Sequence, residues 1–397
     1  MSLMRYLPIV VIAAFFALAC NGTSKRTKSW QNQDNDSIID SIPLKTITCP
    51  YDTFSYTGFN DIALFIAGIE NNNEKNTLAG IARTREWQNY SVAFSSSWAA
   101  YDSTVIDVIQ EWSATHLTVY DTVFYPFSGP DYNYINALFP NSNYYVLIGL
   151  EKTGNIPNIN KMPADTVPVF LSHVKKSLYY NLQHSFFRTK SMEKELNTDM
   201  LDGTIPVLML FLARHNQIIL NMNPVHINSK GYIEISDTLT QYAHTIDKNF
   251  EQGVEIIFRN QADSSIKRLV YLSMDLSNKG IETNNSYTFI NNYCYGNLVF
   301  LKAASYLCHI AAFSEIRNSI LQHASYIVSD PSGIPYISFG DAFNVALYGE
   351  YKGPINLFKE YKQDKLKEDI DSLKPEKLPF KFGYHPNYWC MMVAVRK

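Results

Sequence analysis

The sequence contains little charge and almost no excess of either sign. Of its 397 residues only 18% are charged, below the usual quarter, and 34 Lys and Arg face 37 Asp and Glu. Nucleic-acid-binding proteins show a basic surplus or stripe, so no nucleic-acid partner is expected at a formal net charge of −3. A hydrophobic content of 46% excludes a disordered, collagenous or coiled-coil chain.

Long apolar runs are also scarce, which excludes a membrane protein with several spans. The single long run, residues 6–19, has 14 residues, whereas a membrane-spanning helix needs about 20. Arg5 precedes this run, and polar residues follow it at once. Residues 1–19 are therefore predicted to be a signal peptide.

The end of this run carries the clearest motif of the chain. Ala17-Leu18-Ala19-Cys20 resembles a bacterial lipobox, although Ala17 stands where Leu is more usual. The resemblance implies acylation of Cys20, a membrane partner reached through that lipid, and a location in the bacterial cell envelope, at the outer membrane. Residues 20–41 are polar and are expected to form a flexible tether. Ordinary secretion after cleavage at Ala19, or an uncleaved anchor, are the alternatives.

Four further cysteines are too scattered to indicate a metal site. None of them forms a CxxC pair or a Cys/His set at zinc spacing, so no metal and no cofactor are expected. An oxidising envelope allows two disulfides in three connectivities. Cys308 stands in an apolar pattern and is predicted to be a buried small hydrophobe. The four are Cys49, Cys294, Cys308 and Cys390.

Aromatic residues are abundant, at 14% of the chain. Residues 83–114 show helical periodicity in two pieces, with tryptophans at 87, 98 and 112. We expect these three side chains to pack in the core.

Residues 122–151 predict a βαβ unit. A strand at 122–125 is followed by a tight loop, a helix at 132–139 and a second strand at 144–151. The expected fold class is α/β: one large domain over 42–397 with a mostly parallel, Rossmann-like sheet, flanked by helices and including some antiparallel strands. A weak internal duplication, near 122–151 and 267–310, is a further hypothesis.

The same two strands are similar in layout to those that open a methyltransferase sheet. In that family an acid at the end of the second strand binds the cofactor ribose, and Glu151 occupies the matching position. The loop from Phe127 to Asp131 departs from the family because it has one glycine, and Pro130 lacks the backbone N–H that would contact phosphate. The layout therefore implies a degenerate methyltransferase-like sheet without the cofactor.

Candidate site residues follow from the rule that ligands bind beyond the carboxyl ends of the strands. A helix predicted over 297–313 would also place Lys302, Tyr306 and His309 on one face. The candidate catalytic residues are Asp131, Lys302 and His309. The candidate ligand-binding residues are Ser128, Gly129, Asp131, Glu151, Asp275, Ser305 and Tyr306.

Each candidate also has a purely structural interpretation. Asp131 is well placed to cap the following helix, and Glu151 to be an ordinary surface residue. In this interpretation Lys302 pairs with Asp131, Asp275 or Asp330, since a buried lysine is rare without a partner. The sequence has no Gly-x-Ser-x-Gly, His-Glu-x-x-His, Walker or EF-hand motif that would indicate a reaction.

Three segments together resemble a family of bacterial lipoproteins that carries no assigned activity. They are Tyr125–Asp131, Gly149–Glu151 and Lys302–Leu307, and a composition rich in Asn, Tyr and Ile is similar to that of Bacteroidetes-type proteins. The resemblance implies an envelope location and a stable fold but transfers no catalytic residue.

Two functions therefore stay open. The first is a lipid-anchored binding or envelope-assembly protein, whose partner is a small molecule or an envelope component held in the crevice at the strand ends. The alternative is an envelope hydrolase or transferase that uses Asp131, Glu151, Lys302 and His309. Whether the chain is an enzyme is left undecided by the sequence.

Overall fold

A computed structural model describes residues 58–397 apart from 188, 199–200, 237–251, 263–264 and 285. All of the described residues belong to one compact unit. The predicted signal peptide, the lipidation site at Cys20, the tether and Cys49 lie outside the described residues.

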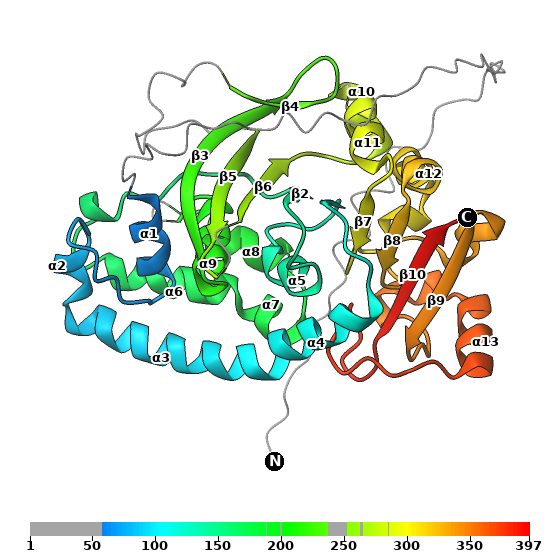
Figure 1. Ribbon diagram of the computed structural model, residues 1–397, viewed down its shortest axis with the longest axis horizontal. Helices are drawn as coiled ribbons and strands as arrows, with labels where there is room; N and C mark the ends of the chain where they lie inside the picture. Colours follow the sequence, from blue (N-terminus) through cyan, green and yellow to red (C-terminus); the bar gives the residue numbers. More distant parts are fainter. Residues whose placement is uncertain (1–57, 188, 199–200, 237–251, 263–264, 285) are drawn as a thin grey trace. The chain divides into compact units, whose positions relative to one another are not determined.

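The described residues build a ten-stranded sheet with the order β4-β3-β5-β6-β2-β1-β7-β8-β10-β9 (Figure 1). This confirms an α/β protein. The strands are β1 (Thr122–Tyr125), β2 (Tyr144–Gly149), β3 (Gln217–Ile227), β4 (Ile233–Ile235), β5 (Gly253–Asn260), β6 (Ile266–Ser273), β7 (Leu298–Leu301), β8 (Tyr326–Ser329), β9 (Phe343–Gly349) and β10 (Cys390–Arg396).

The expectation of a mostly parallel sheet is wrong. Of the nine pairings among these strands, five are antiparallel, and the four parallel ones join β6-β2-β1-β7-β8 in the centre. Strands β3 to β6 follow one another without an intervening helix among the described residues, and antiparallel partners need no helical crossover. At the other edge β10 returns between β8 and β9.

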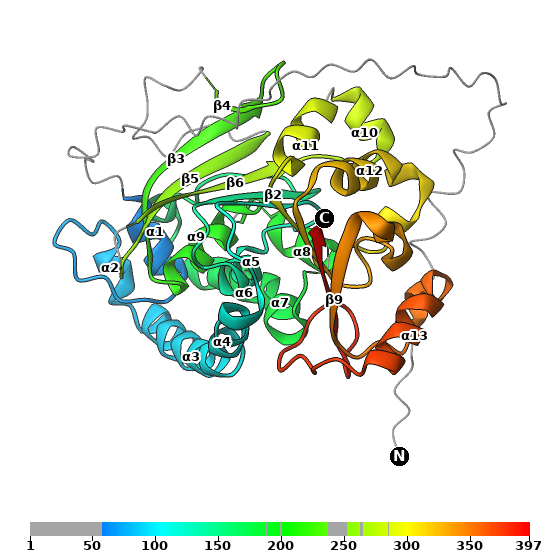
Figure 2. The same cartoon turned by 45° about the vertical axis from the view of Figure 1, so that its right-hand side comes forward.

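Helices cover both faces of the sheet (Figure 2). In both views α3, α4, α6 and α7 lie on one side and α10, α11 and α12 on the other. The helices are α1 (Phe59–Ile66), α2 (Ala79–Ala82), α3 (Arg85–Tyr101), α4 (Asp107–His116), α5 (Tyr132–Leu138), α6 (Val167–Ser177), α7 (Tyr179–His184), α8 (Thr189–Leu196), α9 (Ile205–Arg214), α10 (Asn278–Thr283), α11 (Tyr287–Cys294), α12 (Ser314–His323) and α13 (Asp364–Leu373). A π-helical segment, η2 (Asp102–Ile106), joins α3 to α4.

Two hydrophobic cores follow from the alternation of side chains along the strands. Val123 and Tyr125 of β1 point into the first core, and Phe124 between them points into the second. The first core also contains the three tryptophans at 87, 98 and 112, none more than 5% exposed, as expected. Because both faces are covered, β2, β7 and β8 are buried along their whole length, and ligands can reach these strands only at their ends.

The predicted helix over 297–313 is wrong. Residues Leu298–Leu301 form the buried strand β7, and the chain then turns through short 3-10 segments, η5 (Leu307–His309) and η6 (Ala311–Phe313). A short apolar run does not distinguish a buried strand from a buried helix, which explains the error. Lys302, Tyr306 and His309 therefore do not share a helical face.

The three described cysteines, Cys294, Cys308 and Cys390, are buried thiols that form no disulfide with one another. The prediction that Cys308 is buried is confirmed, although it lies in the 3-10 segment η5 and not on an α-helix. Within the part of the chain that the structure describes, no helix is long and apolar enough to cross a membrane.

Candidate functional site

The candidate site lies where the sheet changes its winding direction. From β1 the chain crosses through α5 to β2 on one side, and from β7 it crosses through α12 to β8 on the other. In open α/β sheets this switch point leaves a crevice beyond the strand ends. Here the loop 126–131 after β1 and the loop 302–306 after β7 come together at that edge.

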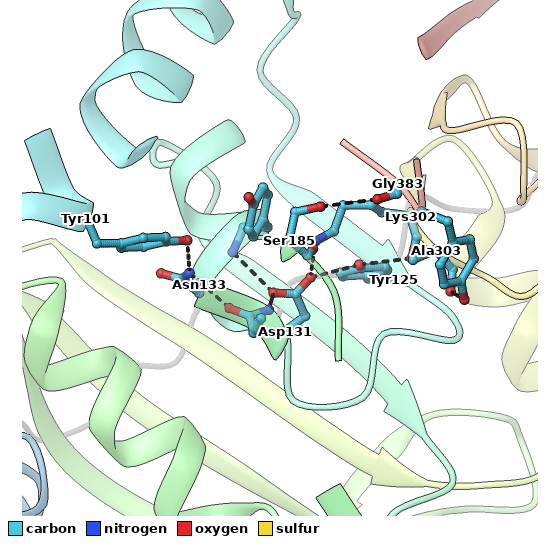
Figure 3. A network of polar contacts seen from close by, with 11 residues as sticks. Tyr101, Tyr125, Asp131, Asn133, Ser185, Lys302, Ala303 and Gly383 are labelled. Atoms are coloured by element: carbon cyan, nitrogen blue, oxygen red, sulfur yellow. Dashed lines mark hydrogen bonds and ion pairs between the residues drawn. The ribbon is translucent and has the colours of Figure 1, made fainter. Parts of the chain in front are cut away.

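Asp131 and Lys302 form a buried ion pair across this edge (Figure 3). Lys302 Nζ lies 2.8 Å from Asp131 Oδ2, and the two side chains are 0% and 2% exposed. Asp131 also caps α5, since its Oδ1 accepts a hydrogen bond from the Tyr134 backbone N–H at 3.4 Å. Of the three acidic partners proposed for Lys302, the structure selects Asp131.

Further partners satisfy both charged groups. The Tyr125 hydroxyl donates a hydrogen bond to Asp131 Oδ2 at 3.1 Å, and Asn181 Nδ2 donates one to Asp131 Oδ1 at 2.9 Å. Lys302 Nζ donates to the Ser185 carbonyl and lies 3.5 Å from the centroid of the Tyr134 ring. Burial lowers the pKa of Lys302, and the carboxylates of Asp131 and Asp330 oppose that shift.

The network continues away from the sheet edge through α5 to its neighbouring helices. Asn133 donates Nδ2 to Asn181 Oδ1 at 3.2 Å and to the Tyr101 hydroxyl at 2.8 Å. His215 Nε2 lies 3.0 Å from Asn133 Oδ1, and burial lowers the pKa of His215 to about 4, so that a neutral ring donates this bond at pH 7. The sequence reasoning missed Asn133, Asn181 and His215. For Asn133 the only signal is that a polar residue stands inside the helix predicted over 132–139.

The loop after β7 has an unusual backbone. Ala303, Ser305 and Tyr306 have φ values of 54°, 54° and 57°, although none of them is glycine. Each such residue costs about 1–3 kcal/mol, and such residues cluster at functional sites. Surrounding bonds hold the loop in place: Ser332 accepts the Ala304 N–H at its hydroxyl, and its carbonyl accepts the Tyr306 N–H.

A small pocket opens beside this strained loop. Tyr306, Asp330, Tyr351, Tyr384 and Tyr388 line it, and its cavity volume is about 30 Å³. The positive φ of 84° at Gly383 and the closeness of Asp330 Oδ2 to this position leave no room for a Cβ there. A glycine is therefore required next to the pocket carboxylate.

Asp330 lies at the end of β8 and is 2% exposed. Its Oδ1 accepts hydrogen bonds from the Ser332 N–H at 3.1 Å and the Ser332 hydroxyl at 2.6 Å. Burial is the largest influence on this carboxyl and raises its pKa to about 6, against the lowering effect of these bonds and of Lys302. Neither Asp330 as a site residue nor Tyr351, Tyr384 and Tyr388 was identified from the sequence.

Three of the other candidates lie on the β2 side of the edge. Ser128 donates its N–H and hydroxyl to the Ile148 carbonyl, at 2.8 and 3.1 Å, which ties the loop 126–131 to β2. A Cβ on Gly149 would meet the Gly129 Cα at 2.8 Å, and a Cβ on Gly129 would lie 3.4 Å from Glu151 Oε2. The carboxylate of Glu151 therefore lies beside Gly129 and Gly149.

The remaining candidates are divided between two places. Ser305 contacts the Tyr384 hydroxyl at 2.8 Å, beside Tyr306 at the pocket. His309 lies against Tyr306, with ring centroids 5.0 Å apart, and burial lowers its pKa to about 4. Asp275 is exposed and accepts bonds from the Ser277 N–H and hydroxyl, which shape the turn before α10.

The described residues contain no group of three or more His, Cys, Asp and Glu that could hold a metal ion. The fold and the site define an α/β protein with a buried ion pair and a tyrosine-lined pocket at the carboxyl edge of its parallel strands. Comparison with protein-family models, with curated proteins and with solved structures finds no match to this chain.

Proposed function

We propose that this chain is a lipid-anchored protein of the bacterial cell envelope that binds a ligand at the carboxyl edge of its parallel strands without transforming it. The observation that carries this proposal is the saturated ion pair of Asp131 and Lys302. An acid–base catalyst must come within hydrogen-bond reach of its substrate. These two groups are bound to each other and use their remaining bonding capacity on protein partners.

The role that fits this pair is to hold the binding edge in shape. Lys302 is the residue directly before Ala303, where the strained loop begins. Its ammonium group joins this loop to α5 through Asp131 and to the end of α7 through the Ser185 carbonyl. Because the strained loop is held on both sides, Tyr306 and its neighbours are presented to a ligand in one arrangement. This lowers the conformational entropy that is lost on binding.

The envelope location rests on the sequence. Ala17-Leu18-Ala19-Cys20 has the lipobox pattern, and the segments around Asp131 and Lys302 resemble a Bacteroidetes-type lipoprotein family. The ligand would then be a small molecule or a component of the envelope.

We infer further that the central strands are a degenerate Rossmann-like, methyltransferase-like sheet. Counted in chain order, the parallel strands β1, β2, β6, β7 and β8 lie in the order 3-2-1-4-5, as in doubly wound sheets. The switch point falls between β1 and β7, next to the loop 126–131. Gly129 is the only glycine of this loop and is covered by Glu151, so this ancestry does not include a retained cofactor site.

The alternative of a hydrolase or transferase is less well supported by the geometry. It requires Asp131 and Lys302 to act on a substrate, together with Glu151 and His309. His309 instead packs on Tyr306, and Glu151 lies against Gly129.

The anchor is tested by fractionating cells that express the full chain. The Cys20→Ala variant should leave the membrane fraction, whereas the matched Cys49→Ala variant should remain there, since it removes a cysteine outside the lipobox. Retention of the Cys20→Ala variant in the membrane would contradict the anchor. Binding is tested by a ligand screen on the purified full chain, because a ligand of the native state raises the melting temperature.

A further inference from the structure

The pocket beside the strained loop combines aromatic rings with an acidic group. Four tyrosines line it, and so does Asp330. Aromatic faces attract cations, most strongly where water is excluded. The tyrosines are Tyr306, Tyr351, Tyr384 and Tyr388.

One of the two acidic residues that line the pocket has no ion-pair partner among the described residues. Glu350 also lines the pocket but is paired with Lys377 at 2.8 Å and Lys352 at 3.4 Å. Asp330 has no ion pair among the residues that the structure describes, because the nearby Lys302 is bound to Asp131. The pKa of His385 is lowered, by burial first and by Lys352 second, so this ring adds no compensating positive charge at pH 7.

A buried carboxylate without a cation is unfavourable for the fold. The raised pKa of Asp330, about 6, still leaves the group mainly ionised at pH 7. A buried carboxyl group with a raised pKa in a pocket is a candidate functional site, because a cation bound there would stabilise its ionised form. An amide side chain at position 330 would avoid this destabilisation.

The size of the pocket limits the partner. A volume of about 30 Å³ holds roughly two water molecules, far less than the several hundred Å³ of a typical pocket for a drug-sized ligand. A sugar ring or a nucleotide does not fit inside it. The end of an aliphatic amine, a methylene and an ammonium group, is of the right size.

We propose that this pocket binds the primary ammonium group of a small ligand, with Asp330 as the counter-ion and the tyrosine rings around it. The inference rests on the proposed function, since it names the ligand chemistry of the same strand edge. A free small amine and the ethanolamine head group of a membrane lipid share this chemistry.

The test uses the full-length Cys20→Ala chain, which the anchor hypothesis makes unlipidated, and ethanolamine as the probe. Saturation-transfer NMR should detect ethanolamine with a Kd of about 1 mM, as suits a ligand of four non-hydrogen atoms. Ethylene glycol has the same length without the charge and should give no signal. A second substitution in this chain, Asp330→Asn, should weaken ethanolamine binding about tenfold or more, because it removes the counter-ion.

Two matched variants separate a local effect from a general one. Asp165→Asn changes the same charge at an exposed position outside the pocket and should leave binding unchanged. Ile355→Trp fills the pocket from a half-buried position and should abolish binding. The source is distinguished with vesicles: a lipid head group predicts binding to phosphatidylethanolamine vesicles over phosphatidylcholine vesicles, lost in Asp330→Asn, whereas a free amine predicts no preference.

The inference is overturned if ethylene glycol binds as well as ethanolamine, or if Asp330→Asn binds ethanolamine as well as the Asp165→Asn control. Binding of a neutral ligand that Ile355→Trp abolishes would overturn the ammonium assignment and leave the proposed function intact. A broad ligand screen without any response that depends on Ile355 would contradict the proposed function itself.

Discussion

Two carboxylates at the same edge of the sheet have opposite surroundings. Asp131 and Asp330 are each 2% exposed, and both follow central parallel strands, β1 and β8. Asp131 has a lysine ammonium at 2.8 Å and two side-chain hydrogen-bond donors, whereas Asp330 has hydrogen bonds but no cation among the described residues. A buried carboxylate that is already ion-paired helps to hold the fold together, whereas a buried carboxylate without a cation partner is available to a cationic ligand.

Breaking the ion pair of Asp131 and Lys302 should have the largest effect on stability. Lys302→Met removes the cation and leaves Asp131 buried, which should lower the free energy of unfolding by about 3–5 kcal/mol. Urea denaturation measures this loss. Lys302→Met combined with Asp131→Asn should recover part of it, because no unpaired charge then remains. A loss below about 1 kcal/mol, typical of surface ion pairs, would contradict the structural role of the pair.

Neutralising Asp330, the carboxylate without a cation partner among the described residues, should raise the free energy of unfolding instead of lowering it. The folded-state pKa of Asp330 is about 6, above its ordinary value of 3.8, so its ionisation destabilises the fold at pH 7. Asp330→Asn should therefore raise the free energy of unfolding by up to about 3 kcal/mol at pH 7.

This gain should shrink as the pH falls through 6 and vanish below about pH 4, where Asp330 is protonated in both states. Denaturation across this pH range checks it, with Asp165→Asn as the exposed control that shows no such trend. A destabilised Asp330→Asn protein at pH 7 would argue against the unfavourable burial of this carboxylate.

Removing a hydrogen-bond donor of Asp131 should have an intermediate effect on stability. Asn181→Ala deletes the amide that donates to Asp131 Oδ1 and to which Asn133 donates. A buried group left without its partner costs about 1–3 kcal/mol. The control is Asn160→Ala, an exposed asparagine bonded to Thr77, which should change stability by less than about 0.5 kcal/mol. Equal effects of the two variants would show that the network around Asp131 is not special.

Relieving the strain in the loop after β7 should have the smallest effect. Ala303→Gly removes the Cβ that disfavours a φ of 54°, worth about 1–2 kcal/mol, and loses about 0.5–1 kcal/mol to the freer unfolded chain. A net gain of some tenths of a kcal/mol is expected from thermal denaturation. Ala311→Gly, at an exposed residue without positive φ, should instead destabilise. A loss in both variants would contradict the strain.

The part of this edge that the sequence predicts is local. Periodicity and length placed β1, α5 and β2 correctly, and helix capping by Asp131 and its pairing with Lys302 were among the stated alternatives. The helix expected over 297–313 was wrong because Leu298–Leu301 is equally apolar as strand or helix. The positive φ values that follow fall on Ala, Ser and Tyr, which give no sequence signal for such a backbone.

The pocket could not be predicted for a different reason. Its lining comes from residues near 306, 330, 351 and 388, which the fold brings together from four separate segments. No spacing rule connects them, because they meet only when β8, β9 and β10 pair. The antiparallel edges of the sheet were underestimated in the same way, since strand pairing is a tertiary property.

The contrast between the two carboxylates is tested most directly by the pKa of Asp330 in the folded protein. Carbon NMR of the full chain labelled at its aspartate carboxyls would follow this group, with Asp330→Asn assigning the signal. We expect a pKa of about 6 that falls when ethanolamine is added, because a bound cation favours the ionised form. A pKa at the ordinary 3.8, unchanged by ethanolamine, would contradict it.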